Sequence, residues 1–221
     1  SKARLLTCRD YTGLEMMRVL KDCVVNEEIG VVEFAPAVEL LSHPDGSCAG
    51  AVLKNLDTGQ FIIVSAKAVI ITTGGSGRLH IQGFPTSNHF GATGDGLCLA
   101  YRIGAPLHLH DTFQYHPTGA VYPEPMVGLL VTEALRATGA QLVNARGERF
   151  VNEGDLRDVV ASAVLRECRE ERGVTTPTGR QGVWLDIPIV DLIHGAGTIE
   201  KRFPNMLRLF SRYNIDIRKE A

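Results

Sequence analysis

The sequence of 221 residues has few cysteines, no long apolar run and no excess of charge of either sign. The five cysteines are scattered and include no C-x-x-C pair, which argues against a disulfide framework and against a zinc site and is typical of a reducing compartment. No apolar run approaches the roughly 20 residues that a membrane span needs. A formal net charge of -2 argues against the strongly basic surface of nucleic-acid-binding proteins. We therefore expect no metal site and no nucleic-acid partner.

The overall composition is that of an ordinary soluble protein. Hydrophobic residues make up 44% and charged residues 22%, so the chain is able to bury a core in one large domain or two small ones. An amphipathic segment begins almost at the first residue, and the last segment stops abruptly. We therefore expect an internal fragment of a longer protein.

The first half of the sequence mixes helical and strand patterns. Residues 11–26 have apolar side chains at helical spacing, with Thr12 as a possible N-cap, and predict a helix. Three short runs, at residues 31–41, 48–55 and 61–64, are separated by glycine-containing turns and predict an antiparallel β-meander. Residues 66–71 are apolar on both faces, which is typical of a buried strand in a parallel sheet. These patterns predict an α/β arrangement.

Two glycine-rich loops follow in the same half. Residues 72–77 come directly after the predicted buried strand, and residues 91–96 open a predicted helix that closes at Gly104. Glycines let backbone N–H groups approach a phosphate, although the first loop does not complete G-x-G-x-x-G and also fits a plain tight turn. Asp95 is a candidate acceptor for a ribose or ribityl hydroxyl, or simply part of a capped helix start. Together the loops favour a dinucleotide of flavin type.

The sequence changes character between Asp111 and Thr118, where we place a domain boundary. Beyond it we predict an α+β arrangement. It comprises a strand pair at residues 141–144 and 149–151, a helix at 156–172 with Asp155 as a possible N-cap, a strand at 183–187 and two short helical pieces within 190–214.

A set of polar residues in this second half forms a candidate site. Taken singly, each has an ordinary explanation as a loop histidine, a helix start or a surface ion pair. Taken together, they place an imidazole, a hydroxyl, a carboxylate and two guanidinium groups in neighbouring segments, which suits a small dicarboxylate. The residues are His116, Thr132, Glu133, Arg136 and Arg157.

Several of these segments resemble the flavoprotein subunit of succinate dehydrogenase and fumarate reductase, a family of FAD enzymes that also includes L-aspartate oxidase. The resemblance runs from about Cys8 to Glu220. It is carried by residues 68–77, Thr93-Gly94-Asp95-Gly96, Gln114-Tyr115-His116-Pro117-Thr118-Gly119, Leu130-Val131-Thr132-Glu133, Gly147-Glu148-Arg149-Phe150 and Arg157-Asp158-Val159-Val160.

The resemblance implies a fold, a cofactor and partners. Residues 1–112 would be part of a split FAD-binding domain, and residues 113–221 most of a capping domain that closes over the flavin. Iron–sulfur and membrane-anchor subunits would accompany the whole protein, in the cytoplasm or at the cytoplasmic face of the inner membrane. Thr73, Gly74, Gly75, Asn88 and Asp95 would lie near FAD.

The resemblance also implies roles in catalysis. His116, Thr132 and Glu133 would hold one carboxylate of fumarate or succinate. Arg157 would deliver the proton, with Glu133 and Arg136 as its relay. Composition and spacing alone would not nominate an arginine as an acid, because a guanidinium is essentially never deprotonated.

Three further expectations follow. The complete G-x-G-x-x-G unit and the later histidine and arginine for the second carboxylate are not in this sequence, so we expect the isolated polypeptide to be inactive. An L-aspartate oxidase is the alternative enzyme, although Gly119 favours an enzyme of succinate and fumarate. A non-catalytic capping or interaction domain, associating through exposed apolar surface, is the alternative outside the enzymes.

Overall fold

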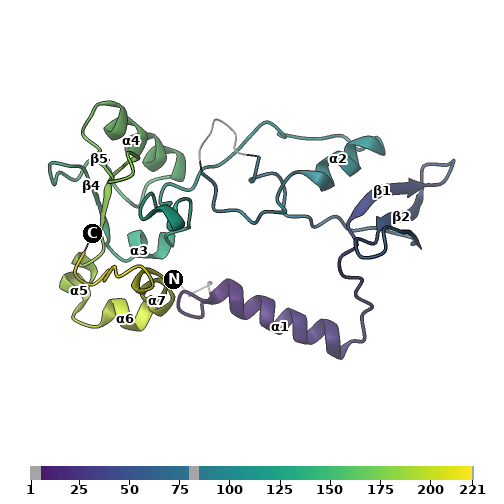
Figure 1. Ribbon diagram of the computed structural model, residues 1–221, viewed down its shortest axis with the longest axis horizontal. Helices are drawn as coiled ribbons and strands as arrows, with labels where there is room; N and C mark the ends of the chain where they lie inside the picture. The colour runs from purple at the N-terminus through teal and green to yellow at the C-terminus, as the bar shows by residue number, and fades with distance from the viewer. Residues whose placement is uncertain (1–5, 80–84, 221) are drawn as a thin grey trace, which may run out of the picture. The chain divides into compact units, whose positions relative to one another are not determined.

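The computed structural model describes residues 6–79 and 85–220 and divides into two compact units (Figure 1). One unit comprises residues 27–113, and the other combines residues up to Asn26 with residues 114–221. The first four residues and Ala221, on which part of the fragment prediction rests, lie outside the described residues. No helix in the described ranges is long and apolar enough to cross a membrane.

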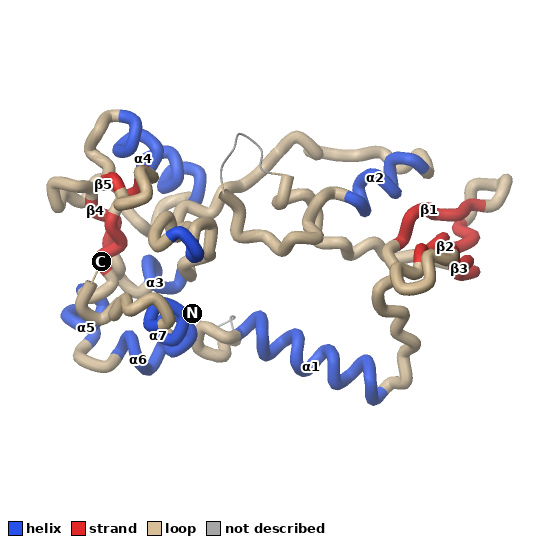
Figure 2. The backbone as a smooth tube through the Cα atoms, in the orientation of Figure 1, coloured by secondary structure: helices blue, strands red, loops and turns tan. Residues whose placement is uncertain are grey.

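The unit of residues 27–113 contains the predicted β-meander. Strands β1 (Ala37–Ser42), β2 (Cys48–Lys54) and β3 (Phe61–Ser65) pair antiparallel in that order (Figure 2). The turn after β2 forms because the side-chain oxygen of Asn55 accepts hydrogen bonds from two backbone N–H groups, those of Asp57 and Thr58. The prediction of an antiparallel meander is thus confirmed.

Helix α2 (Asp95–Arg102) follows the second glycine loop, as predicted. Gly94 lies at its N-cap with φ 83°, and Gly104 follows its end with φ 88°, both in the left-handed region that glycine adopts without strain.

The predicted buried strand at residues 66–71 is wrong for this structure. The N–H of Ala66 donates to the Ala49 carbonyl at 3.1 Å, but the segment beyond it forms no strand, and Ile70 is 87% exposed. An apolar segment becomes a strand only when a neighbouring strand satisfies its backbone groups. Every strand pairing among the described residues is antiparallel, so the expected parallel sheet is not confirmed.

In the other unit, helix α1 (Thr12–Asn26) has the predicted extent, yet none of its residues is buried. Thr12 is the first residue of the helix rather than its cap, and its hydroxyl accepts from the Cys8 N–H at 3.0 Å. Just before α1, the carboxylate of Asp10 accepts from the N–H groups of Asn205 and Met206, at 3.1 and 2.9 Å. These bonds join the start of the chain to helix α7 (Pro204–Ser211).

Residues 114–221 form the main hydrophobic core. It lies among α3 (Glu133–Ala137), α5 (Ile189–His194), α6 (Thr198–Arg202) and α7, so three short helices occupy the region where two were predicted.

Strand β4 (Gln141–Val143) pairs antiparallel with β7 (Trp184–Asp186), and β5 (Val174–Thr175) pairs with β6 (Gln181–Gly182). A 3₁₀ turn, η2 (Glu124–Met126), adds the buried Met126. The fully buried side chains include Met126, Leu135, Leu142, Val160, Val190, Ile199 and Ile217.

Helix α4 (Arg157–Arg169) is shorter than predicted and begins differently. The predicted N-cap, Asp155, is wrong: Leu156 occupies that position and its apolar side chain cannot cap, while the Asp155 carboxylate accepts from Asn152 Nδ2 at 3.0 Å. The predicted strand at 149–151 is reduced to one bridge between Val143 and Arg149. Arg157 therefore stands in the first position of α4.

Candidate active site

Helix α3 is a single short helix whose two ends are both closed by local bonds. The Thr132 hydroxyl accepts from the Ala134 N–H at 3.4 Å at its start. At its end, Gly139 has φ 115°, and the N–H groups of Gly139 and Ala140 donate to the carbonyls of Arg136 and Leu135 at 3.0 Å each. This is a Schellman closure, which satisfies carbonyls that the helix leaves unpaired. With Leu135 fully buried, α3 is anchored and positions Glu133 and Arg136 one turn apart.

Glu133 joins the two arginines of the candidate site. Arg157 donates to Glu133 Oε2 from Nη2 at 2.6 Å and from Nε at 3.2 Å, although the two residues are 24 positions apart. Arg136 Nη2 donates to Glu133 Oε1 at 3.1 Å. The structure thus brings together the three residues to which the family resemblance assigned proton transfer, in the order Arg157, Glu133, Arg136.

The pKa values of the hydrogen-bonded residues Arg157 and Glu133 follow from this geometry. The hydrogen bond from Arg157 is the main reason that the pKa of Glu133 lies below its ordinary value, and the same bond raises the pKa of Arg157. Glu133 is therefore a carboxylate at neutral pH, and Arg157 is a guanidinium. The side chain of Arg157 is 42% exposed and that of Glu133 40% exposed, so both are accessible from solvent.

Arg136 differs from Arg157 in being almost completely enclosed. Its side chain is 1% exposed, its Nη1 donates to the main-chain oxygen of Glu153 at 2.8 Å, and its Nε has no partner among the described residues. Burial of a guanidinium is costly unless it is paired, which here requires Glu133 and the carbonyl of residue 153.

Gln114 contacts Arg157 and Glu153 contacts Arg136, and the sequence assigned no role to either Gln114 or Glu153. Gln114 Oε1 accepts from Arg157 Nη1 at 3.2 Å. The place of Gln114 next to Tyr115-His116, in one of the motifs that carry the family resemblance, was the available signal for it. For Glu153, the sequence offered only a carboxylate four residues after Arg149.

His116 is half-buried and held through Thr118. The Thr118 N–H donates to His116 Nδ1 at 3.2 Å, and the Thr118 hydroxyl donates to the Val131 carbonyl at 3.0 Å. Burial, followed by the positive charges of Arg136 and Arg157, lowers the pKa of His116 below its ordinary value. The ring is therefore neutral at neutral pH, and because Nδ1 accepts a hydrogen bond, its proton lies on Nε2.

The two glycine loops lie together within the unit of residues 27–113. The Gly94 N–H donates to the Gly75 carbonyl at 2.9 Å, and the Arg78 N–H donates to the Ala92 carbonyl at 2.8 Å. Gly74 and Gly75 have φ values of 81° and 75°, with open space where a side chain would project. Their N–H groups have no acceptor in the part of the chain that the structure describes. Such exposed, unpaired N–H groups fit an anionic phosphate.

The remaining predicted cofactor residues border these loops. The Thr73 side chain packs so closely on Gly96 that a Cβ there would collide with its hydroxyl, and Asn88 blocks a Cβ at Gly77 in the same way. Asp95 accepts from the Thr93 hydroxyl at 2.5 Å. The polar oxygens and bare backbone of this region fit a cofactor that carries phosphate and hydroxyl groups.

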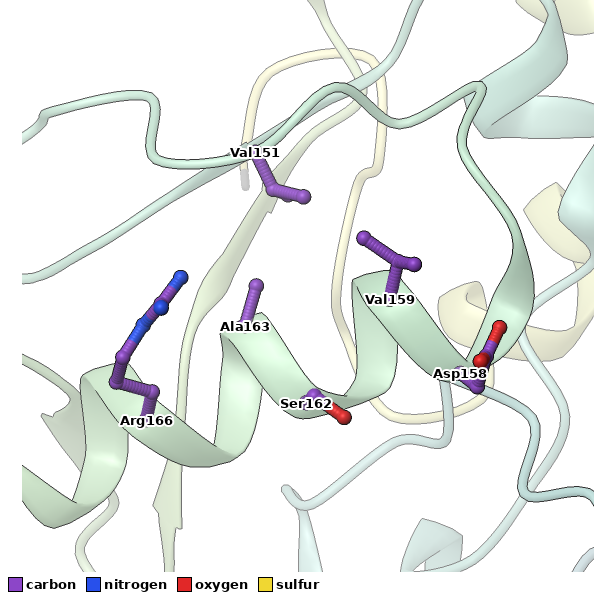
Figure 3. Close-up of a pocket in the computed structure, with 6 residues that line it drawn as sticks. All are labelled: Val151, Asp158, Val159, Ser162, Ala163 and Arg166. Atoms are coloured by element: carbon purple, nitrogen blue, oxygen red, sulfur yellow. The ribbon is translucent and has the colours of Figure 1, made fainter.

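A hollow of about 340 Å³ lies elsewhere, along α4. Figure 3 shows Asp158 and Arg166 toward its two ends, with Val151, Val159, Ser162 and Ala163 between them. None of the predicted site residues lines it. We therefore place the candidate site at the Glu133–Arg157 pair rather than in this hollow.

Comparison with known proteins decides the family. A sequence model described as an FAD binding domain matches residues 2–220. The chain belongs to this FAD-binding family. Its homologues are flavoprotein oxidoreductases of the succinate dehydrogenase and fumarate reductase type, together with L-aspartate oxidase, so the resemblance predicted from the motifs and FAD as the family's cofactor are both confirmed.

Individual relatives support the same assignment. The chain is 33% identical to the succinate dehydrogenase flavoprotein subunit of Coxiella burnetii, over 98% of this chain and 36% of that protein. It is 35% identical to an L-aspartate oxidase of a Nostoc species, over 100% of this chain and 37% of that protein. A structure of E. coli quinol fumarate reductase FrdA with an E245Q mutation matches with a TM-score of 0.79 and 29% identity, over 97% of this chain and 38% of that chain. The family fold is therefore present, and the chain spans a little over a third of the length of these relatives.

Proposed function

We propose that the full-length protein containing this chain is an FAD-dependent oxidoreductase that interconverts succinate and fumarate. One observation carries the proposal, namely the hydrogen-bonded order Arg157, Glu133, Arg136, which joins an exposed guanidinium to an enclosed one through a single carboxylate. An ion pair that only stabilised the protein surface would not need the buried Arg136 as a third residue.

In this proposal one carboxylate of the substrate is held by His116 and Thr132. The neutral ring of His116 donates to the substrate through Nε2–H. Because the ring is uncharged, it does not form an ion pair with Glu133 that would compete with the substrate. The Thr132 hydroxyl accepts from Ala134, and its own proton has no acceptor within the described residues, so it is free to donate to the substrate. Glu133 itself positions Arg157 near the same carboxylate.

Arg157 then delivers the proton. FAD, when bound, supplies the hydride exchange with one substrate carbon, and the chain supplies the proton for the other. A guanidinium loses its proton only if the charge is restored at once. The Glu133 carboxylate, 2.6 Å from Arg157 Nη2 and 3.1 Å from Arg136 Nη2, would pass a proton from Arg136 to Arg157, and solvent would in turn restore the proton of Arg136.

We further propose that residues 1–112 contribute to an FAD-binding domain and residues 113–221 to a capping domain. Thr73, Gly74, Gly75, Asn88 and Asp95 would hold FAD. The glycine N–H groups would donate to its phosphates, and Asp95 would accept from a ribityl or ribose hydroxyl. We expect iron–sulfur and membrane-anchor subunits to join the full-length protein at the cytoplasmic face of the inner membrane.

An L-aspartate oxidase is the second candidate. The identity of 35% to the Nostoc enzyme is close to the 33% found for the Coxiella succinate dehydrogenase flavoprotein, so overall similarity does not separate the two substrates. Two parallel assays do: the purified full-length protein with FAD is given fumarate and a reduced dye in one, and L-aspartate and an electron acceptor in the other. Turnover of aspartate without turnover of fumarate would reject the proposal.

The isolated chain provides a second test. We expect no fumarate reduction by residues 1–221 alone, and we would titrate them with FAD while following flavin absorbance and fluorescence quenching. Tight binding would show that the two glycine loops suffice to hold the cofactor. Fumarate turnover by this polypeptide would contradict the expected inactivity.

A non-catalytic role in association is favoured by one feature. Helix α1 buries none of its residues, and its apolar side chains Leu14, Met17 and Leu20 are 66%, 65% and 53% exposed. We expect the isolated chain to self-associate through such surface. Light scattering on a size-exclusion column measures this, and a folded monomer at every concentration would reject it.

A further inference from the structure

Glu153 is the most enclosed carboxylate near the proposed proton path, and the proposed function assigns it no role. Its side chain is 5% exposed. It lies four residues before Arg157 in sequence, in the loop that leads into α4. What this residue contacts connects three parts of the unit.

The carboxylate of Glu153 makes two kinds of bond. Oε1 accepts from the Leu142 N–H of strand β4 at 2.8 Å, and Oε2 accepts from Arg149 Nη2 at 2.6 Å. Leu142 is fully buried, so its N–H would otherwise lose a hydrogen bond with no water to replace it. The carboxylate thus anchors the loop at residue 153 to β4 and to Arg149.

The main chain of the same residue reaches the proposed relay. The carbonyl oxygen of Glu153 accepts from Arg136 Nη1 at 2.8 Å. Because Arg136 Nε has no partner among the described residues, this carbonyl and Glu133 are the acceptors that orient the buried guanidinium. A shift of the loop would move that carbonyl and, a few residues later, the start of α4 with Arg157.

We propose that Glu153 is a positioning residue for proton delivery, whose carboxylate fixes the loop that orients Arg136 at one side and Arg157 at the other. The proposal rests on the proposed function for its catalytic consequence, while its structural part can be tested at Arg136 without any assay of activity. Glu153 contacts no substrate and acts only through these two arginines.

Glu167 provides a matched control. It is also a carboxylate with 5% exposure, and it also pairs with an arginine, accepting from Arg172 Nη2 at 2.7 Å and from Asn144 Nδ2 at 3.0 Å. Neither Arg172 nor Asn144 belongs to the proposed proton path. Glu167→Gln therefore reports what loss of a buried, paired carboxylate does to this unit in general.

The first experiment compares Glu153→Gln with Glu167→Gln in the full-length protein loaded with FAD. We expect both to lower the melting temperature. Glu153→Gln should also lower kcat for fumarate reduction about tenfold with KM within about twofold, because small misplacements of reacting groups cost that much or more. Glu167→Gln should leave kcat within about twofold of the unaltered protein. Equal kcat values in the two variants would overturn the catalytic part.

The second experiment does not depend on fumarate. In protein labelled with ¹⁵N-arginine, the Nε–H signal of Arg136, assigned through its loss in Arg136→Lys, should exchange slowly with solvent. We expect Glu153→Gln to accelerate that exchange at least about tenfold and Glu167→Gln to leave it unchanged. Unaltered exchange in Glu153→Gln would overturn the positioning role even if the enzyme is active. If the unaltered protein fails to reduce fumarate, the proposed function fails, and this exchange measurement still decides the role of Glu153.

Discussion

Arg157 Nη2 lies 2.6 Å from Glu133 Oε2, although 24 residues separate the two in the sequence. One residue begins α4 and the other begins α3, so their contact depends on how two short helices pack. The same carboxylate contacts the enclosed Arg136 through its other oxygen, at 3.1 Å. This arrangement generates the first prediction.

Replacement of Arg157 by lysine should abolish most turnover of fumarate in the full-length protein. Lysine keeps the positive charge but cannot make the two parallel bonds that a guanidinium makes with a carboxylate. General acid catalysis is worth about 100-fold or more, so kcat should fall at least that far. Steady-state kinetics with fumarate measure the effect. Arg169→Lys, near the exposed end of the same helix, should have little effect, and equal losses in both variants would contradict the role of Arg157.

Replacement of Gly75 by valine should weaken FAD binding. Gly75 has φ 75°, which costs a β-branched residue about 1–2 kcal/mol, and the new side chain would project into the open space beside the loop N–H groups. Gly59 has φ 70° and similar open space in a turn of the β-meander, so Gly59→Val carries the same backbone strain away from the loops.

We expect similar losses of stability in the two glycine variants, and an increase in Kd for FAD of about tenfold or more only in Gly75→Val. Fluorescence titration of the full-length protein with FAD measures binding, and thermal melting measures stability. Unchanged FAD affinity in Gly75→Val would argue against the proposed cofactor loops.

The stability of the unit that contains His116 should decrease as pH falls below 6.5, the ordinary pKa of histidine. Because burial and two arginines lower the pKa of His116 in the folded state, the unfolded chain takes up a proton first, and stability is lost on acidification. Urea denaturation at a series of pH values measures this. His116→Asn should flatten the slope, and an unchanged slope in that variant would contradict the part assigned to His116.

Glu167 should stabilise the protein above pH 4.5 and lose that effect as the pH falls toward 2. The bonds from Arg172 and then Asn144 lower its pKa from 4.5 to about 2, so its charged form is favoured in the folded state. Glu167→Gln should therefore be less stable than the unaltered protein at neutral pH, with the difference shrinking on acidification. A difference in unfolding free energy between the two proteins that stays the same at every pH would contradict this assignment.

Much of the local structure could be predicted from the sequence because it depends on neighbouring residues. Turn residues such as Asn55 and Gly59 bond within their own segment, and they punctuate the β-meander as expected. The helical spacing of residues 11–26 likewise predicted α1. The prediction failed where a side chain had two possible local partners. The Asp155 carboxylate accepts from Asn152 instead of capping α4.

The residue types of the site could also be named from the sequence, since His116, Thr132, Glu133, Arg136 and Arg157 lie in motifs with a family resemblance. Their connectivity could not, because hydrogen bonds between α3 and α4 depend on packing of segments far apart in the chain. Gln114 and Glu153 were missed for the same reason.

Residues 66–71 mark the clearest division between the two kinds of information. Their apolar pattern on both faces is a property of the sequence alone. Whether they form a strand depends on a partner that hydrogen-bonds their backbone, and none of the described strands does so. The sequence by itself determined the local turns, the extent of α1 and the chemistry of the side chains. Only the tertiary structure decided which of those side chains meet, because hydrogen bonds between distant segments depend on how those segments pack around the core that includes Leu135.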